Sequence, residues 1–316
     1  MPDIYLGIDT SNYTSSCAVY IPDENNVISK KQLLPVPEGQ MGLRQSDAVF
    51  HHTKNLPALL SSLINQLGEN SSIKAVGASC RPRDVDGSYM PCFCVGEGFC
   101  KALAASYNAE EYYFSHQAGH IAAALWSSKK FDCIGKNFIA FHVSGGTTDV
   151  LLVEPDRENI FKITEIASSL DLKAGQAVDR VGGMLSLKFP AGQELDKLAR
   201  SSDVDFKIKP YIKDGCCSFS GLQNKCGDML KRGCPKEDIA KFCIDYIYES
   251  IAAMTVYALK KYGDLPLIFA GGVMSNSIIR ERIEKKFGGY FAQSEFSSDN
   301  AAGIAYLSFL KNTVLD

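Results

Sequence analysis

A strand, a polar turn and a returning strand follow one another in residues 137–153, NFIAFHVSGGTTDVLLV. Residues 4–21, IYLGIDTSNYTSSCAVYI, are organised in the same way, with apolar runs on either side of small and hydroxyl-bearing side chains. Because strands and helices follow in each half of the chain, we predict a duplicated α/β fold. The two turns would then face one ligand, whose phosphates lie near both.

Apolar periodicity predicts the elements that surround these two units. The expected helices are 45–68, 96–107, 173–188, 192–201, 219–231, 236–262, 276–286 and 300–310. The expected further strands are 74–79 and 266–270.

The composition is that of an ordinary globular protein. Hydrophobic residues make up 46% of the 316 residues and charged residues 22%, which excludes disorder, collagen and coiled coil. A net charge of −3 argues against a protein that coats nucleic acid, but not against a local binding patch. The 11 cysteines lack the spacing of a disulfide framework, and neither a signal sequence nor an apolar run of about 20 residues is found. We therefore expect a cytoplasmic protein that does not enter a membrane.

Two glycine pairs are candidate anion sites. In residues 144–147, SGGT, the glycines permit positive φ and let backbone N–H groups approach a phosphate closely. At Gly271 and Gly272 a buried strand runs into a helix that begins near Asn276, which is a second place where a phosphate can bind. Either pair can equally be an ordinary turn, so both alternatives remain open.

His116 and His120 are the candidate metal ligands. At positions i and i+4 two imidazoles share one helix face, which suits a divalent ion. Position 117 is Gln, so the H-E-x-x-H signature of metalloproteases is absent. Asp299 is the candidate for a third ligand. The alternative is a pair of partly buried histidines that only make hydrogen bonds.

Carboxylates and arginines complete the set of candidate residues. Asp9 and Asp171 lie at strand ends or turns, where each can orient a metal-bound water or a substrate, or else cap a helix. Arg81 and Arg83 flank a proline directly after a buried strand. Two guanidinium groups in such a loop suit a carboxylate or a phosphate.

In this order the motifs resemble those of the threonylcarbamoyl transferase family, TsaD, also called glycoprotease-like and grouped with peptidase family M22. The resemblance covers nearly the whole chain. The segments that carry it are residues 7–11 (GIDTS), 116–120 (HQAGH), 143–146 (VSGG), 170–179 (LDLKAGQAVD), 189–192 (FPAG), 218–222 (SFSGL), 271–276 (GGVMSN) and 299–300 (DN).

The resemblance implies a duplicated ASKHA fold, the actin-like ATPase architecture. It implies subdomains over 1–128 and 129–295 with a nucleotide and metal cleft between them, and a final helix over 296–316 that crosses back to the first subdomain. It implies one divalent iron or zinc ion at His116, His120 and Asp299. It also implies that an adenine nucleotide or acyl-adenylate contacts Ser144, Gly145, Gly146, Thr147, Asp171, Gly175, Asp179, Gly192, Gly272 and Asn276.

The family reaction moves a threonylcarbamoyl group from its adenylate to N6 of adenosine 37 in tRNA and releases AMP. The resemblance therefore implies a transferase and not a protease, with tRNA and TsaB- or TsaE-like proteins as partners. We expect Asp9, Thr147 and Arg83 to act at the reacting groups.

The chain departs from the family pattern in the loops that would face the ligand. Residues 12–15 replace C-D-E-T and lose two carboxylates, and residues 81–84 replace G-P-G-L and gain two arginines. Thr147 replaces a histidine, and Gln176 replaces a glutamate. The predicted metal ligands are retained. These changes leave two alternatives open: a paralogous adenylate-dependent transferase that acts on another anionic substrate, and a non-catalytic assembly partner.

Overall fold

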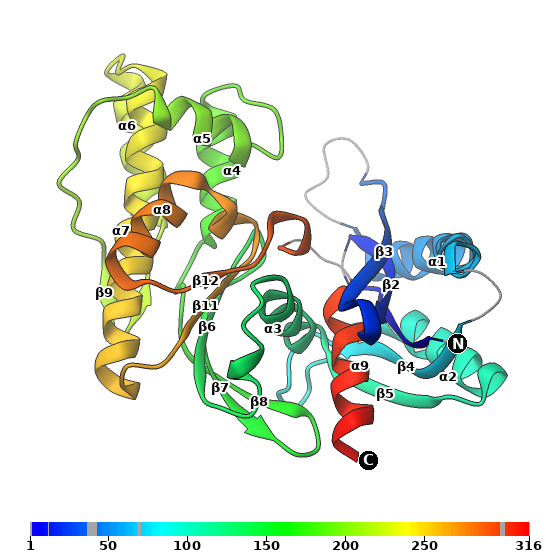
Figure 1. Ribbon diagram of the computed structural model, residues 1–316. Coiled ribbons are helices and arrows are strands. Elements are labelled where there is room, and N and C mark those ends of the chain that lie inside the picture. The colour runs from blue at the N-terminus through cyan, green and yellow to red at the C-terminus, as the bar shows by residue number, and fades with distance from the viewer. Residues whose placement is uncertain (1, 12, 37–42, 68–70, 298–300, 316) are drawn as a thin grey trace. The chain divides into compact units, whose positions relative to one another are not determined.

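Two five-stranded sheets and the helices around them form the protein (Figure 1). This computed structural model describes residues 2–11, 13–36, 43–67, 71–297 and 301–315. The predicted α/β class is confirmed.

The chain divides into two compact units. Unit 1 comprises Met1–Phe131, Pro155–Lys162 and Ser298–Asp316, and unit 2 comprises Asp132–Glu154 and Ile163–Ser297. The short segment Pro155–Lys162 belongs to unit 1, whereas the subdomains expected from the sequence placed it in the second, over residues 129–295.

The sheet of unit 1 has the strand order β3-β2-β1-β4-β5. Strand β1 pairs antiparallel with β2 and parallel with β4, which in turn is parallel to β5. The strands are β1 (Asp3–Asp9), β2 (Thr14–Ile21), β3 (Asn26–Leu33), β4 (Ser72–Arg81) and β5 (Glu110–Ser115). The helices are α1 (Gln45–Leu67), α2 (Phe93–Tyr107), α3 (His116–Ser127) and α9 (Ala302–Leu315).

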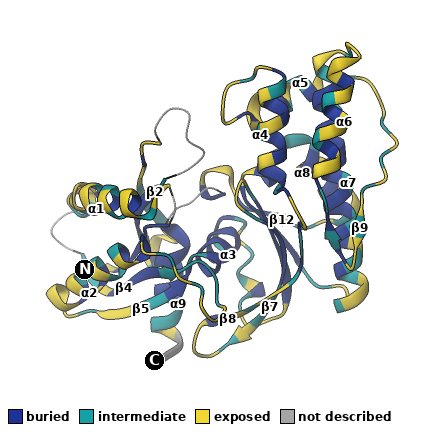
Figure 2. Cartoon of the chain, turned by 180° about the vertical axis from the view of Figure 1, so that it is seen from behind, coloured by how far each residue is buried: buried dark blue, intermediate teal, exposed yellow. Residues whose placement is uncertain are grey.

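Strand β1 is buried on both faces, which explains why residues 4–8 are an unbroken apolar run. Ile4, Leu6 and Ile8 pack with side chains of α1 and α2, while the alternate residue Tyr5 contacts Phe309 of α9 edge to face, with ring centroids 5.2 Å apart. The outward side of α1 is largely exposed (Figure 2). The sheet of unit 1 is therefore a buried layer with helices on both faces.

The sheet of unit 2 repeats the order of the first when it is followed from β8 to β12: β8-β7-β6-β11-β12. Strand β6 is antiparallel to β7 and parallel to β11, as β1 is to β2 and β4. The strands are β6 (Phe138–Val143), β7 (Thr148–Asp156), β8 (Ile160–Ser168), β11 (Leu267–Ala270) and β12 (Tyr290–Phe291), with a short hairpin of β9 (Ile212–Lys213) and β10 (Cys216–Cys217). The helices are α4 (Ala174–Met184), α5 (Gly192–Arg200), α6 (Ser220–Lys231), α7 (Lys236–Tyr262) and α8 (Ser277–Phe287), with the 3-10 turn η3 (Gly272–Ser275). The matching strand orders are direct structural support for the predicted duplication.

Helix α7 forms the centre of the helical layer of unit 2. Ile247 and Ile251 of α7 belong to the same buried cluster as Phe141 of β6 and Phe269 of β11, whose rings stack with centroids 4.8 Å apart. By length and apolar composition alone α7 could cross a membrane, but 67% of its most apolar stretch is buried within the protein. Each of the 11 cysteines, all of which lie within the described residues, is a free thiol.

Helix α9 approaches two neighbours in unit 1 so closely that only glycine fits between the backbones. A Cβ on Gly7 of β1 would lie 2.6 Å from the carbonyl oxygen of Ala301. A Cβ on Gly303 would overlap the carbonyl group of Gly119 in α3, whose carbon would be 2.7 Å away. These contacts set how far α3 and α9 stand from each other.

We predict that Gly303→Ala lowers the free energy of unfolding by about 3 kcal/mol, because the added methyl meets backbone atoms that cannot rotate away. Gly227→Ala is the matched control: Gly227 lies within α6, and a Cβ there would have no heavy atom within 4 Å. The control should raise stability by about 0.5–1 kcal/mol through helix propensity. Urea unfolding followed by circular dichroism measures both. Equal effects of the two substitutions would contradict the proposed close packing.

Candidate functional site

Three parallel strands of unit 1 end at the same edge of their sheet, and a polar residue lies at each end. Asp9 ends β1, Ser79 lies beside it on β4, and Ser115 ends β5. His116 follows as the first residue of α3. The carboxyl edge of parallel strands is where α/β proteins commonly place a binding site.

The two histidines are held together by the start of α3. The Ser115 hydroxyl caps this helix, because its Oγ accepts a hydrogen bond from the Ala118 N–H at 3.1 Å. His116 and His120 then lie one turn apart on the same side, with their Nε2 atoms separated by 3.0 Å. The His116 side chain is 14% exposed and His120 is buried. The predicted pairing of these imidazoles on one helix face is present in the structure.

Asp9 lies behind His116 and has no contact with solvent. Its carboxylate accepts hydrogen bonds from Ser11 Oγ at 2.9 Å and from Ser79 Oγ. His116 Nδ1 lies 3.3 Å from Oδ1 and 3.2 Å from Oδ2 of the same carboxylate. A buried carboxylate needs such partners. This location supports an orienting role for Asp9, not a capping one.

The separation of the two Nε2 atoms fits a shared metal ion. Two imidazole nitrogens that each lie about 2.0–2.1 Å from one ion, at angles between square and tetrahedral, are about 2.9–3.3 Å apart. A carboxylate on the far nitrogen of a ligating histidine is the usual support for such a ligand. In the part of the chain that the structure describes, no group of three histidine, cysteine or carboxylate side chains is arranged to hold an ion. Asp299, the predicted third ligand, lies outside the described residues.

Arg81, the last residue of β4, is engaged in contacts within the protein. The Arg81 guanidinium forms an ion pair with Asp84 at 2.6 Å, and its Nη1 lies 2.9 Å from Cys80 Sγ. Asp84 also accepts a 2.6 Å hydrogen bond from Ser115, so Arg81 helps to tie this loop to the start of α3. Arg83 is half-buried, and its backbone N–H donates to Ser88 Oγ. The suggestion that Arg81 binds an anion is therefore not supported by its contacts.

The polar turn of unit 2 is closed by the side chain of its first residue. Ser144 Oγ accepts hydrogen bonds from the N–H groups of Gly146 and Thr147 and lies 2.8 Å from Thr147 Oγ1. Neither Gly145 nor Gly146 has the positive φ that a glycine permits. A Cβ on either residue would meet no heavy atom within 4 Å. The outer side of this turn is therefore open.

The start of α4 packs directly against this turn. The Gly175 N–H donates to the Ser144 carbonyl at 3.1 Å, and a Cβ on Gly175 would lie 2.6 Å from the Gly145 nitrogen. Gln176 Oε1 accepts a hydrogen bond from the Lys173 N–H at 3.3 Å, which is the contact that Glu or Gln makes at the third position of a helix. Gln176, at the position where the family pattern has a glutamate, therefore makes a capping contact that either residue type can make.

The turn after β11 contains one glycine that the fold requires and one that it does not. Gly271 has a φ of +97°, and a Cβ on it would lie 2.6 Å from the carbonyl carbon of Val143. Gly272 has neither constraint, because a Cβ there would have no heavy atom within 4 Å. Since Val143 directly precedes Ser144, the open glycines of the two turns belong to one region of unit 2.

Three of the side chains predicted to contact the nucleotide, Asn276, Asp179 and Asp171, also make hydrogen bonds at helix ends. Asn276 Oδ1 accepts hydrogen bonds from the Ile278 and Ile279 N–H groups and so caps α8. Asp179 accepts from the Ala191 N–H at 2.9 Å, just before Gly192 begins α5. Burial raises the pKa of Asp179 more than this hydrogen bond lowers it.

Asp171, which is not part of α6, accepts hydrogen bonds from residues at the start of that helix. Its carboxylate accepts the N–H groups of Phe219 at 2.8 Å and Ser220 at 3.1 Å, and the hydroxyl of Ser218 at 2.6 Å. Partial burial raises the pKa of Asp171, but the hydrogen bonds from Ser218, Ser220 and Phe219 outweigh it and hold the pKa well below its usual range. Of the two roles open from the sequence, these contacts favour capping.

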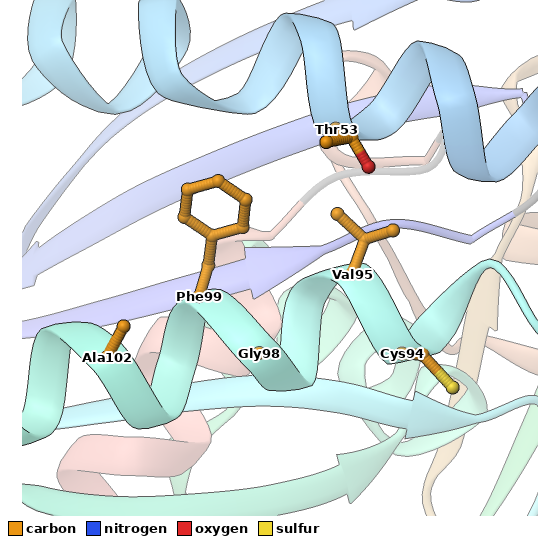
Figure 3. A pocket seen from close by; sticks show the side chains of 6 residues that line it. All are labelled: Thr53, Cys94, Val95, Gly98, Phe99 and Ala102. Atoms are coloured by element: carbon orange, nitrogen blue, oxygen red, sulfur yellow. The ribbon is translucent and has the colours of Figure 1, made fainter.

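A shallow apolar pocket of about 350 Å³ lies in unit 1 between α1 and α2 (Figure 3). Thr53 of α1 faces Val95, Phe99 and neighbouring residues of α2 across it. None of the residues predicted for the site lines this pocket.

Comparison with known proteins gives a consistent result. The family model described as "TsaD: tRNA N6-adenosine threonylcarbamoyltransferase" matches residues 25–306. Proteins named tRNA N6-adenosine threonylcarbamoyltransferase include one from Kosmotoga olearia, 30% identical over 94% of this chain and 91% of that protein. Another, from Archaeoglobus fulgidus, is 27% identical over 97% of this chain and 91% of that protein.

Solved structures share the fold at low sequence identity. Component A of the Acidaminococcus fermentans (R)-2-hydroxyglutaryl-CoA dehydratase superimposes with a TM-score of 0.56 at 17% identity, over 98% of this chain and 99% of that one. HypF of T. kodakarensis superimposes with a TM-score of 0.65 at 12% identity, over 99% of this chain and 48% of that one. These neighbours are of the ASKHA type, so the predicted duplicated ASKHA fold is confirmed.

We predict that Asp171→Ala lowers the free energy of unfolding by about 1 kcal/mol at pH 7, as for the loss of a helix cap. The folded-state pKa of Asp171 lies below its unfolded value of about 3.9. The wild-type advantage is therefore fully present above that value and declines as the pH falls toward the folded-state pKa. Urea unfolding at a series of pH values from 7 to 3 measures it.

Asp228→Ala is the control for this substitution. Asp228 is an exposed residue of α6, the helix whose start Asp171 contacts, and its carboxylate forms a 3.7 Å ion pair with Lys231. Its loss should change stability by less than about 0.5 kcal/mol. The capping role is refuted if Asp171→Ala changes the free energy of unfolding as little as Asp228→Ala does, or if its effect does not depend on pH.

Proposed function

Because the chain belongs to the TsaD family of tRNA N6-adenosine threonylcarbamoyltransferases, we propose that it transfers a threonylcarbamoyl group from an adenylate to tRNA with the help of a metal ion. The amine at N6 of adenosine 37 forms a bond to the carbamoyl carbon and loses one proton. The bond between that carbon and the phosphate oxygen breaks, and AMP leaves. The protein contributes chiefly by positioning the donor and the acceptor.

The observation that carries this proposal is the histidine pair. His116 and His120 present their Nε2 atoms to each other at 3.0 Å, with the Asp9 carboxylate against Nδ1 of His116. Imidazole and carboxylate are suitable ligands for divalent iron or zinc, and Asp299 is the proposed third ligand. When bound, the ion supplies positive charge for the phosphate or carbamoyl oxygens of the donor.

The open glycine region of unit 2 is the proposed nucleotide site. Gly145, Gly146 and Gly272 are needed neither for positive φ nor for close packing within the protein. Space left over backbone N–H groups suits the phosphates of an adenine nucleotide or acyl-adenylate. Thr147, whose hydroxyl lies 2.8 Å from Ser144 Oγ, is the side chain in that turn best placed to act near the donor.

Partners follow from the proposed reaction. We propose that tRNA binds to a local surface, because the net charge of −3 provides no general attraction to nucleic acid. TsaB- or TsaE-like proteins are proposed as partners, and the cytoplasm as the compartment.

The alternative of a paralogue that acts on another anionic substrate was based on Arg81 and Arg83. The ion pair of Arg81 with Asp84 does not support a role for Arg81. We propose Arg83 as the residue that contacts the carboxylate of the transferred group or of a different substrate, because a guanidinium group matches the geometry of a carboxylate.

We predict that expression of this chain restores N6-threonylcarbamoyladenosine in tRNA of a strain that lacks the family enzyme, and that His120→Ala does not. Wild-type protein purified without chelator should hold about one iron or zinc ion per chain, and His120→Ala less than about half of that. Mass spectrometry of nucleosides and of metals measures the two effects.

His51→Ala is the control, since His51 is a half-buried histidine of α1 that lies outside the pair. It should keep both the metal and the modification. Metal binding without restored modification would favour the paralogue, and protein without metal would favour the assembly partner.

We also predict that Gly272→Val weakens binding of AMP at least tenfold without lowering the Tm of the free protein, because valine fills space that the fold leaves open. The rise of Tm with AMP concentration reports the affinity. Gly227→Val is the control, because Gly227 lies within α6 and a Cβ there would likewise have no heavy atom within 4 Å. Unchanged AMP binding in Gly272→Val would remove this region as the nucleotide site.

A further inference from the structure

A chain of buried hydroxyl and carboxylate groups leads from the sheet of unit 1 to the histidine pair. Ser79 on β4 is fully buried, and its Oγ donates a hydrogen bond to Oδ1 of Asp9. Asp9 lies against Nδ1 of His116, whose Nε2 faces His120. We propose that Ser79 is a positioning residue that fixes Asp9 and, through it, the tautomer and orientation of His116. This inference rests on the metal-dependent function proposed above.

The register of the sheet explains why Ser79 reaches Asp9. Ile8 of β1 pairs with Ala78 of β4, so the next residues of the two parallel strands are neighbours at the carboxyl edge. The pairing of β4 with β5 shifts by one residue between Ser79 and Arg81. Ser79 thus lies at the end of the regular ladder, where a bulge turns the chain toward the loop of Arg81.

The hydrogen bonds to Asp9 divide between its two oxygens. Ser11 Oγ donates to Oδ2 at 2.9 Å, and Ser79 Oγ donates to Oδ1. With both oxygens held, the carboxylate cannot rotate about its own bond without leaving a buried acceptor unsatisfied, which costs about 1–3 kcal/mol. A carboxylate fixed in this way keeps both oxygens against His116 Nδ1, at 3.3 Å and 3.2 Å.

The position of Asp9 selects the tautomer of His116. A carboxylate accepts hydrogen bonds and cannot donate one, so the proton of His116 resides on Nδ1, and Nε2 carries a lone pair directed at His120. A metal ligand must present such a lone pair. Groups behind a ligating histidine usually change metal affinity by 10–100-fold when they are removed.

The test compares Ser79→Ala with Ser16→Ala. Ser16 is equally buried, and its Oγ donates to the backbone carbonyl of Asp9 at 3.2 Å, so its loss removes a nearby hydrogen bond without touching the carboxylate. Competition with a chromophoric chelator measures the affinity for Zn²⁺. We expect Ser79→Ala to bind Zn²⁺ at least tenfold more weakly than the wild type. The affinity of Ser16→Ala should lie within about threefold of the wild-type affinity. Ser79→Thr keeps the hydroxyl and should bind Zn²⁺ as tightly as Ser16→Ala.

A second measurement uses the metal-free protein. Long-range ¹H–¹⁵N NMR correlations of the imidazole distinguish Nδ1–H from Nε2–H. The wild type and Ser16→Ala should show His116 as the Nδ1–H tautomer, and Ser79→Ala should show shifts averaged over both tautomers. If Ser79→Ala does not fold, Ser11→Ala, which removes the donor to the other oxygen, is measured in its place with the same expectation.

The inference is overturned if Ser79→Ala keeps both the Zn²⁺ affinity and the single tautomer, or if Ser16→Ala loses as much affinity as Ser79→Ala. A wild type that fails to bind Zn²⁺, Co²⁺ or Fe²⁺ would refute the metal-dependent function itself. The tautomer measurement in metal-free protein would then still decide the role of Ser79, so the two failures are distinguishable.

Discussion

The close contact of α9 with β1 and α3 is the constraint on which the histidine pair depends. A side chain on Gly7 or Gly303 would overlap backbone atoms of the neighbouring element, and for Gly303 these atoms belong to Gly119 of α3. Protein interiors tolerate little extra volume, so this contact sets the position of α3. The imidazoles of His116 and His120 are carried by the first turns of that helix, and their 3.0 Å separation follows from its geometry.

Residues of the predicted nucleotide motifs divide into two groups with different physical roles. Asp171, Asn276 and Gln176 satisfy backbone N–H groups at the starts of helices, which would otherwise lack partners. A Cβ on Gly145 or Gly272 would meet no heavy atom within 4 Å, so these glycines leave space beside the backbone. A motif that is shared with a family therefore contains residues that stabilise the fold and residues that leave space for a ligand.

The elements that could be predicted from the sequence are those with strong apolar periodicity. Helix α7 was predicted with the bounds it has, and β1, β6 and β11 were predicted because burial on both faces makes them continuous apolar runs. The edge strand β3 was missed, because its sequence NVISKKQL is mostly exposed and carries two lysines. Strands β5 and β8 were also missed, since each mixes charged and apolar residues.

The sequence by itself determined the α/β class, the duplication, the family and the histidine pair, because these depend on local periodicity and on short motifs. Only the tertiary structure decided the roles of single polar residues. Ser79 and Asp9 are 70 positions apart, and nothing in the sequence indicates that parallel strands place them side by side. Likewise, Arg81 was a candidate anion ligand until its ion pair with Asp84 was known. A polar side chain takes its role from the partners that it meets, and folding brings those partners from distant parts of the chain.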